Sequence, residues 1–163
     1  WTRVREDVRK RLLIVDEAWT MMQHEDSAKF LYSIAKRGRK YYLGLTAISQ
    51  DVDEFLGSKY GKAVVTNSSI QFLLRQSDAA IRLVSDTFNL SSGESSFLTK
   101  AAVGEGIFFA GKNHVAVKII ASRAEHRLIT SNPKELARMK DKNITVDHDD
   151  ITEGALIYEP GVD

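Results

Sequence analysis

Short apolar runs that each end in polar residues constrain the fold of this chain more than any other feature. Residues 12–15, 42–48 and 70–74 are mostly apolar stretches of strand length. Strands that are apolar on both faces are typical of a parallel sheet covered by helices. We therefore predict that the three segments lie in one sheet, in a fold of the α/β class.

Helical patterns separate these strands. Residues 26–39 place apolar side chains at the i, i+3, i+4 spacing of an amphipathic helix. Residues 79–88 predict a helix capped by Asp78, and a further helix is expected from a cap at Ser92 to about Ala101. Shorter helical segments are expected at 51–56 and 62–65, and a terminal helix at 133–140. Residues 104–110 and 114–121 predict a hairpin, so the expected sheet is mainly parallel with a late antiparallel hairpin.

Polar side chains follow the three strands at the points where they end. Asp16 and Glu17 follow the first strand, Gln50 follows the second and Arg75 follows the third. Because the carboxyl ends of parallel strands meet at one edge of a sheet, we expect Asp16, Gln50 and Arg75 at the same edge. Ligands bind at this edge in open α/β sheets, so it is the predicted functional site.

An apolar strand that ends in Asp-Glu has the Walker B pattern of nucleotide hydrolysis. Asp16 can hold Mg²⁺, often through water, and Glu17 can polarise an attacking water. The neutral amide of Gln50 can bond both a γ-phosphate and that water without adding charge. The guanidinium of Arg75 suits phosphate oxygens. Each residue also has a plainer interpretation: two acids can simply end a strand, Gln50 can cap the next segment, and Arg75 can form a salt bridge.

The composition excludes several classes of function. The 163 residues contain no cysteine, which rules out disulfides, thiolate nucleophiles and Cys-based zinc sites. No apolar stretch approaches the roughly 20 residues of a membrane helix. The net charge of +1 is the sum of an excess of basic residues in 1–140, the basic body, and an excess of acidic residues in 141–163. We therefore divide the chain into a domain at 1–140 and an acidic, flexible tail at 141–163.

The sequence lacks one part that a nucleotide-hydrolysing site of this type needs. The phosphate-binding string G-x-x-x-x-G-K-[ST] occurs nowhere in the chain. In this fold the phosphate loop precedes the Walker B strand, and the chain begins at Trp1 rather than Met. We expect the chain to be the C-terminal portion of a longer protein, inactive on its own, in which the strand at 42–48 lacks a partner on one edge.

The string Leu-Leu-Ile-Val-Asp-Glu-Ala-Trp at 12–19 closely resembles the DEAW motif of the type IV secretion and conjugal-transfer ATPases. These are the TraC-like, "VirB-four" family within the HerA/FtsK group of RecA-like motors. The resemblance covers about residues 11–136. The other segments that resemble the family are Phe30, the basic segment 37–41, the predicted strand 44–50 ending in Ser-Gln, Asn67, the Leu-Leu-Arg-Gln segment at 73–76, the predicted strand 104–109, and Asn132-Pro133.

This resemblance implies a partial RecA-like, three-layer motor domain that uses ATP and Mg²⁺. It implies that Asp16 is the magnesium-side acid, Glu17 the catalytic base and Gln50 the γ-phosphate sensor. Arg75, or Arg39, would be the arginine that acts on the nucleotide across a subunit boundary.

The implied partners are other subunits of the same ATPase, as a hexamer, and inner-membrane components of the secretion system. The implied location is cytoplasmic, peripheral to the bacterial inner membrane. Two alternatives remain open. A DNA-pumping translocase of the same group would use the basic body to follow a nucleic-acid backbone and would bind DNA in a salt-dependent way. A catalytically inert partner-binding module would not hydrolyse ATP.

Overall fold

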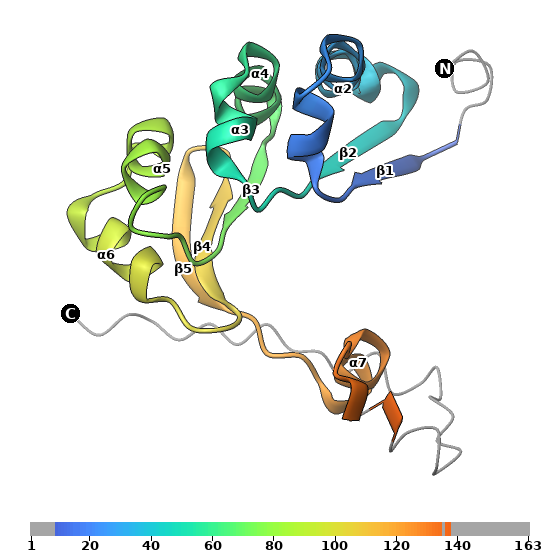
Figure 1. The fold of residues 1–163 in the computed structure, drawn as a ribbon. Helices are drawn as coiled ribbons and strands as arrows, with labels where there is room; N and C mark the ends of the chain where they lie inside the picture. Colours follow the sequence, from blue (N-terminus) through green and yellow to red (C-terminus); the bar gives the residue numbers. More distant parts are fainter. Residues whose placement is uncertain (1–8, 135, 138–163) are drawn as a thin grey trace.

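The computed structural model describes residues 9–134, 136 and 137. The elements alternate between strands and helices along most of this range (Figure 1). In chain order they are β1 (Arg11–Val15), η1 (Ala18–Met22), α2 (Glu25–Arg37), η2 (Gly38–Tyr41), β2 (Leu43–Ala47), α3 (Val52–Gly57), α4 (Lys59–Asn67), β3 (Ile70–Leu73), α5 (Ile81–Phe88), α6 (Ser92–Lys100), β4 (Glu105–Ala110), β5 (Asn113–Lys118) and α7 (Arg123–Ile129). The tail predicted at 141–163 lies outside the described residues.

The strands form two sheets. β1 and β2 pair in parallel, with Leu13 opposite Leu45, and β3, β4 and β5 form an antiparallel sheet in that order. The expected α/β class with a late hairpin is confirmed, but the prediction that the first three strands share one sheet is wrong. Hydrogen-bonded strands must lie about 4.8 Å apart, and no strand within the described residues bridges β2 and β3. Within this range β2 pairs with β1 on one edge, and no strand pairs with its other edge.

Several helix starts differ from the sequence predictions. Asp78 is not a cap, because α5 begins only at Ile81, after a turn in which Ala80 N–H donates to the Ser77 carbonyl. α6 is capped by Ser91 rather than Ser92, since Ser91 and Glu94 form a reciprocal capping box. α7 was not predicted, although Ser122 and Glu125 form the same motif.

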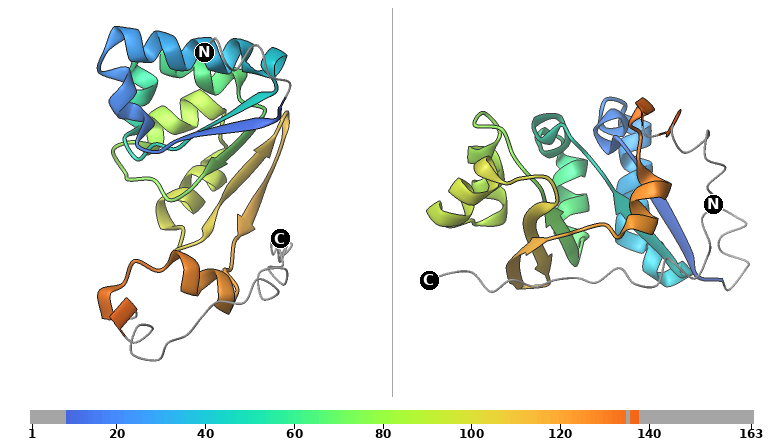
Figure 2. Two further views of the ribbon diagram at one scale, coloured as in Figure 1. Left: turned by 90° about the vertical axis from the view of Figure 1, so that its right-hand side faces the viewer. Right: turned by 90° about the horizontal axis from the view of Figure 1, so that it is seen from below.

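The helices place most of the core on one side of the strands. α2, α3, α4 and α5 lie on one side, whereas α7 lies apart on the other (Figures 1 and 2). One cluster of buried residues is formed by η1, α2, α3 and α4, and a second is formed by α5, α6 and β4. The first contains Ala18, Leu31, Phe55, Leu56 and Val64, and the second contains Val84, Leu98, Ile107 and Phe109. Val52 and Phe88 pack against both, so the two sheets share a continuous core.

The β1–β2 sheet is covered on one face only within the described structure. Val15, Leu45 and Ala47 pack against the first cluster. Leu12 and Ile14 point to the opposite face and are 63% and 60% exposed. The exposed apolar face agrees with the sequence pattern of a parallel sheet that is built to be buried on both sides. Within the described range, no helix has the length and apolar character to cross a bilayer.

Candidate functional site

The turn after β1 holds Glu17 in an unusual backbone conformation. Glu17 has φ 49° and ψ 46°, in the left-handed region. For a residue other than glycine this conformation costs roughly 1 kcal/mol or more. Local hydrogen bonds offset the cost: Glu17 N–H donates to Asp16 Oδ1 over 2.9 Å, and Thr20 Oγ1–H donates to the Glu17 carbonyl over 2.8 Å. The turn therefore directs the Glu17 side chain differently from the strand before it.

Both carboxylate oxygens of Glu17 accept short hydrogen bonds. Trp19 Nε1–H donates to Oε2 over 2.6 Å, and Gln50 Nε2–H donates to Oε1 over 2.7 Å. Glu17 and Trp19 are half-buried and Gln50 is exposed. Gln50 is 33 residues from Glu17 in sequence, so this contact joins the ends of two strands. The structure thus brings the predicted acid and amide together at the carboxyl edge of β1 and β2.

Backbone hydrogen bonds extend the pairing of β1 and β2 into this site. Ile48 N–H donates to the Val15 carbonyl over 2.9 Å, and Ala18 N–H donates to the Ile48 carbonyl over 2.8 Å. Beyond Gln50, the Asp51 side chain caps α3 by accepting from Glu54 N–H over 2.9 Å. The loop that carries Gln50 is therefore fixed at both ends, by the extended ladder and by the cap.

Asp16 lies beside this pair and is exposed. A shallow hollow of about 310 Å³ is lined by Glu17, Trp19, Gln50 and Asp51, and Asp16 is not among its lining residues. The described residues contain no cluster of three or more side chains that could ligate a metal. Magnesium is commonly held by one or two carboxylates, with water and phosphate oxygens as its other ligands. The exposed Asp16 carboxylate beside an acid and an amide fits that mode of binding.

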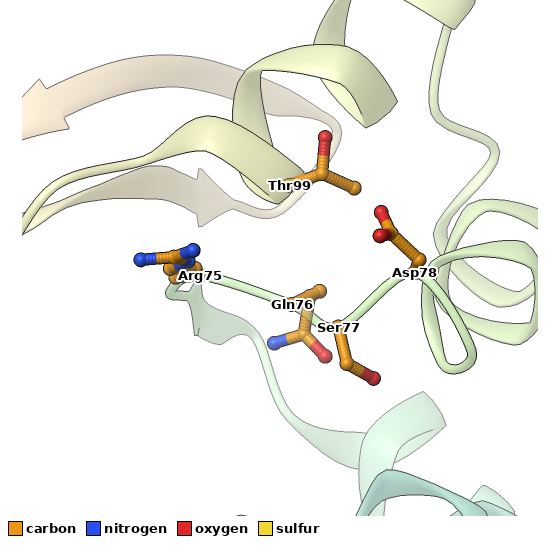
Figure 3. A pocket seen from close by; sticks show the side chains of 5 residues that line it. All are labelled: Arg75, Gln76, Ser77, Asp78 and Thr99. Carbon is orange, nitrogen blue, oxygen red and sulfur yellow. The ribbon is translucent and has the colours of Figure 1, made fainter.

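Arg75 lies at a different hollow from Glu17 and Gln50. It is exposed and lines a cavity of about 440 Å³ together with Gln76, Ser77, Asp78 and Thr99. Figure 3 shows Arg75 on one side of this hollow, with Asp78 and Thr99 on the other. The structure therefore does not bring Arg75 into the Glu17–Gln50 hollow of the same chain.

Arg39 lies at the opposite end of β2 from Gln50. It belongs to η2, which precedes Leu43, whereas Gln50 follows Ala47. Because a strand separates them, Arg39 does not line the Glu17–Gln50 hollow of its own chain. A role for either arginine in a neighbouring subunit's site stays a prediction.

Sequence reasoning missed two residues of this site. Trp19 donates to the carboxylate of Glu17, and Asp51 fixes the helix after Gln50. The signal for Asp51 was present, since an Asp followed three residues later by Glu54 is a helix-start pattern. The contact of Trp19 depends on the left-handed backbone of Glu17, which no sequence pattern indicated.

The fold and this edge of polar residues define a class, the P-loop-type α/β domains with a partial RecA-like fold. The family model of the TraG P-loop domain matches residues 2–100. The structure of VirB4 from Thermoanaerobacter pseudethanolicus is similar, with 37% sequence identity, a TM-score of 0.70 and coverage of 77% of this chain. The chain spans 35% of that VirB4 chain. A search of curated proteins gave no match.

The family model covers more than half of the chain, and the VirB4 structure agrees with it in both sequence and fold. The chain therefore belongs to the TraG/VirB4 family of type IV secretion and conjugal-transfer ATPases. The predicted resemblance is confirmed, as is the partial RecA-like fold.

Proposed function

We propose that this chain forms the C-terminal portion of a motor domain that hydrolyses ATP to power pilus assembly or substrate transfer in type IV secretion or conjugation. The observation that supports this most directly is the 2.7 Å hydrogen bond between Gln50 and Glu17. It joins an acid and an amide at the carboxyl ends of neighbouring parallel strands, where α/β sheets bind their ligands. Membership of the TraG/VirB4 family supports the same proposal.

The proposed roles follow from the chemistry of each side chain. Bound Mg-ATP would supply the phosphoryl group that is transferred to water. Asp16 would hold the magnesium ion, in part through water, because its carboxylate is exposed. Glu17 would take a proton from the attacking water at a carboxylate oxygen, and the Gln50 amide would orient that water. Arg75 would neutralise developing charge in a neighbouring subunit's site.

The proposed assembly is a hexamer at the cytoplasmic side of the bacterial inner membrane, in contact with inner-membrane components of the secretion system. An arginine that acts between subunits would couple hydrolysis at one site to the position of the next subunit. Arg75 suits this role because it is exposed and outside its own chain's Glu17–Gln50 hollow.

The test of this function is Glu17→Gln in the full-length protein. The substitution keeps the size of the side chain and removes the base, so we expect steady-state phosphate release to fall by about 10²-fold or more. Glu54→Gln is the matched control, because it makes the same chemical change at an exposed glutamate whose side chain accepts a hydrogen bond from Gln23. Unchanged turnover in Glu17→Gln would show that Glu17 is not the base.

The DNA-pumping alternative has its own test. Lys36, Arg37, Arg39 and Lys40 are exposed at the end of α2 and in η2. A translocase that uses such residues would bind DNA with an affinity that falls steeply as salt is raised. Absence of salt-dependent DNA binding by the full-length protein would argue against it, whereas hydrolysis that depends on Glu17 would dismiss the inert module.

A further inference from the structure

The two hydrogen bonds to Glu17 come from donors of different character. Trp19 is half-buried and packs against the core cluster that contains Leu31 and Phe55, so its indole has a fixed position. Gln50 is exposed on the loop between β2 and α3. One carboxylate oxygen therefore bonds to a donor fixed by packing, and the other to a donor that solvent reaches and that can rotate away.

The local backbone is shaped to make the contact with Trp19. The 3₁₀ turn η1 starts directly after Glu17 and brings the Trp19 indole back to the carboxylate of Glu17. The left-handed conformation of Glu17 is what allows this return, and conformations of this kind cluster at functional sites. The resulting bond joins a neutral donor to a carboxylate, which is stronger than a bond between neutral groups.

We propose that Trp19 is a positioning residue, which fixes Oε2 of Glu17 and so aims the carboxylate, while Gln50 masks Oε1 in the nucleotide-free state. This inference rests on the proposed function, in which Glu17 is the base. The Gln50 amide already bonds Oε1 over 2.7 Å, so an attacking water must compete with that amide for Oε1. Gln50 must release Oε1 before Glu17 can act, which suppresses hydrolysis until the amide finds another acceptor.

The first test measures the reactivity of Glu17 without reference to ATP hydrolysis. The nucleotide-free, full-length protein is treated with a carbodiimide and glycine ethyl ester, and labelling of Glu17 is compared with that of Asp16 by tandem mass spectrometry. Asp16 is an internal reference because it is adjacent and exposed. Trp19→Phe keeps an aromatic ring and removes the N–H, and Gln50→Ala removes the amide.

We expect each variant to raise the labelling of Glu17 relative to Asp16 by about two- to tenfold, the equilibrium equivalent of one net hydrogen bond. Gln23→Ala is the control and should leave the ratio unchanged, since its side chain bonds Glu54 rather than Glu17. A ratio that stays at the wild-type value in both Trp19→Phe and Gln50→Ala would overturn the proposal.

The second test separates positioning from a general loss of structure. Trp19→Phe should lower kcat for ATP about tenfold while KM stays within about twofold, because the base is misaimed but the binding groups remain. An unchanged kcat in Trp19→Phe would overturn the positioning role. If the wild-type protein does not hydrolyse ATP, the proposed function fails, whereas the labelling result still decides whether Trp19 and Gln50 occupy Glu17.

Discussion

Gly61 is the position at which a single methyl group should damage this fold most. Gly61 is buried in α4, and a Cβ atom placed on it would lie 2.8 Å from the carbonyl carbon of Phe55 and closer still to its oxygen. The obstacle is backbone of α3 and cannot rotate away. Phe55, Leu56 and Val64 belong to one core cluster, so separating α3 from α4 would open it. Overpacking typically costs 1–3 kcal/mol, and we expect Gly61→Ala to lose about 3 kcal/mol of stability.

Gly57 provides a matched control four residues earlier. It is the exposed last residue of α3, and a Cβ atom there meets nothing within 4 Å. Gly57→Ala should therefore gain about 0.5 kcal/mol by restricting the unfolded chain. For a chain of this size the loss in Gly61→Ala corresponds to a fall in Tm of roughly 6–12 °C. Thermal unfolding followed by far-ultraviolet circular dichroism measures both variants, and equal melting temperatures would refute the steric argument.

Two further predictions concern the Glu94 capping box and Arg75. Partial burial would raise the pKa of Glu94, but hydrogen bonds from the Ser91 hydroxyl and backbone N–H, together with His114, outweigh it and hold that pKa below its ordinary value of 4.5. Because the folded-state pKa is the lower one, this stabilisation is present at neutral pH and is lost as the pH falls through and below 4.5. Glu94→Gln should flatten the acid limb of a pH series of melting temperatures, and an unchanged limb would contradict this. If Arg75 acts between subunits, mixing equal amounts of the inactive Glu17→Gln and Arg75→Ala proteins should restore about a quarter of wild-type turnover. That is the chance that random assembly places an intact Glu17 in one subunit beside an intact Arg75 in the next. No recovery of turnover would show that Arg75 does not act between subunits.

The contact between Glu17 and Gln50 could be predicted because it depends on a simple property of parallel strands. Two apolar runs of similar length, each ending in polar residues, place those residues at one edge once the strands pair in register. The contact between Trp19 and Glu17 could not be predicted in this way. It depends on a left-handed backbone at a residue other than glycine, and sequence patterns flag that conformation mainly where glycine occurs.

The division into two sheets could not be predicted from the sequence either. The apolar run at β3 has the same appearance as β1 and β2, but it pairs in antiparallel fashion with β4, far along the chain. The β4–β5 hairpin could be predicted, because a glycine between two apolar segments favours a tight turn. In the structure this glycine, Gly111, takes φ +64°. Local turn chemistry thus fixed the hairpin, whereas the partner of β3 depends on long-range pairing.

The absence of a phosphate-binding loop from the sequence bears on nucleotide binding by the 163-residue chain alone. The described structure supplies Asp16, Glu17 and Gln50 at one edge of β1 and β2, but the sequence contains no G-x-x-x-x-G-K-[ST] string. Such a string provides the backbone amides and the lysine that cradle the phosphates. Carboxylates without that cradle repel a triphosphate, so we predict no tight binding of Mg-ATP. Isothermal titration calorimetry of the purified chain measures this, and a micromolar dissociation constant for the monomer would show that the phosphates are held by groups other than a phosphate loop.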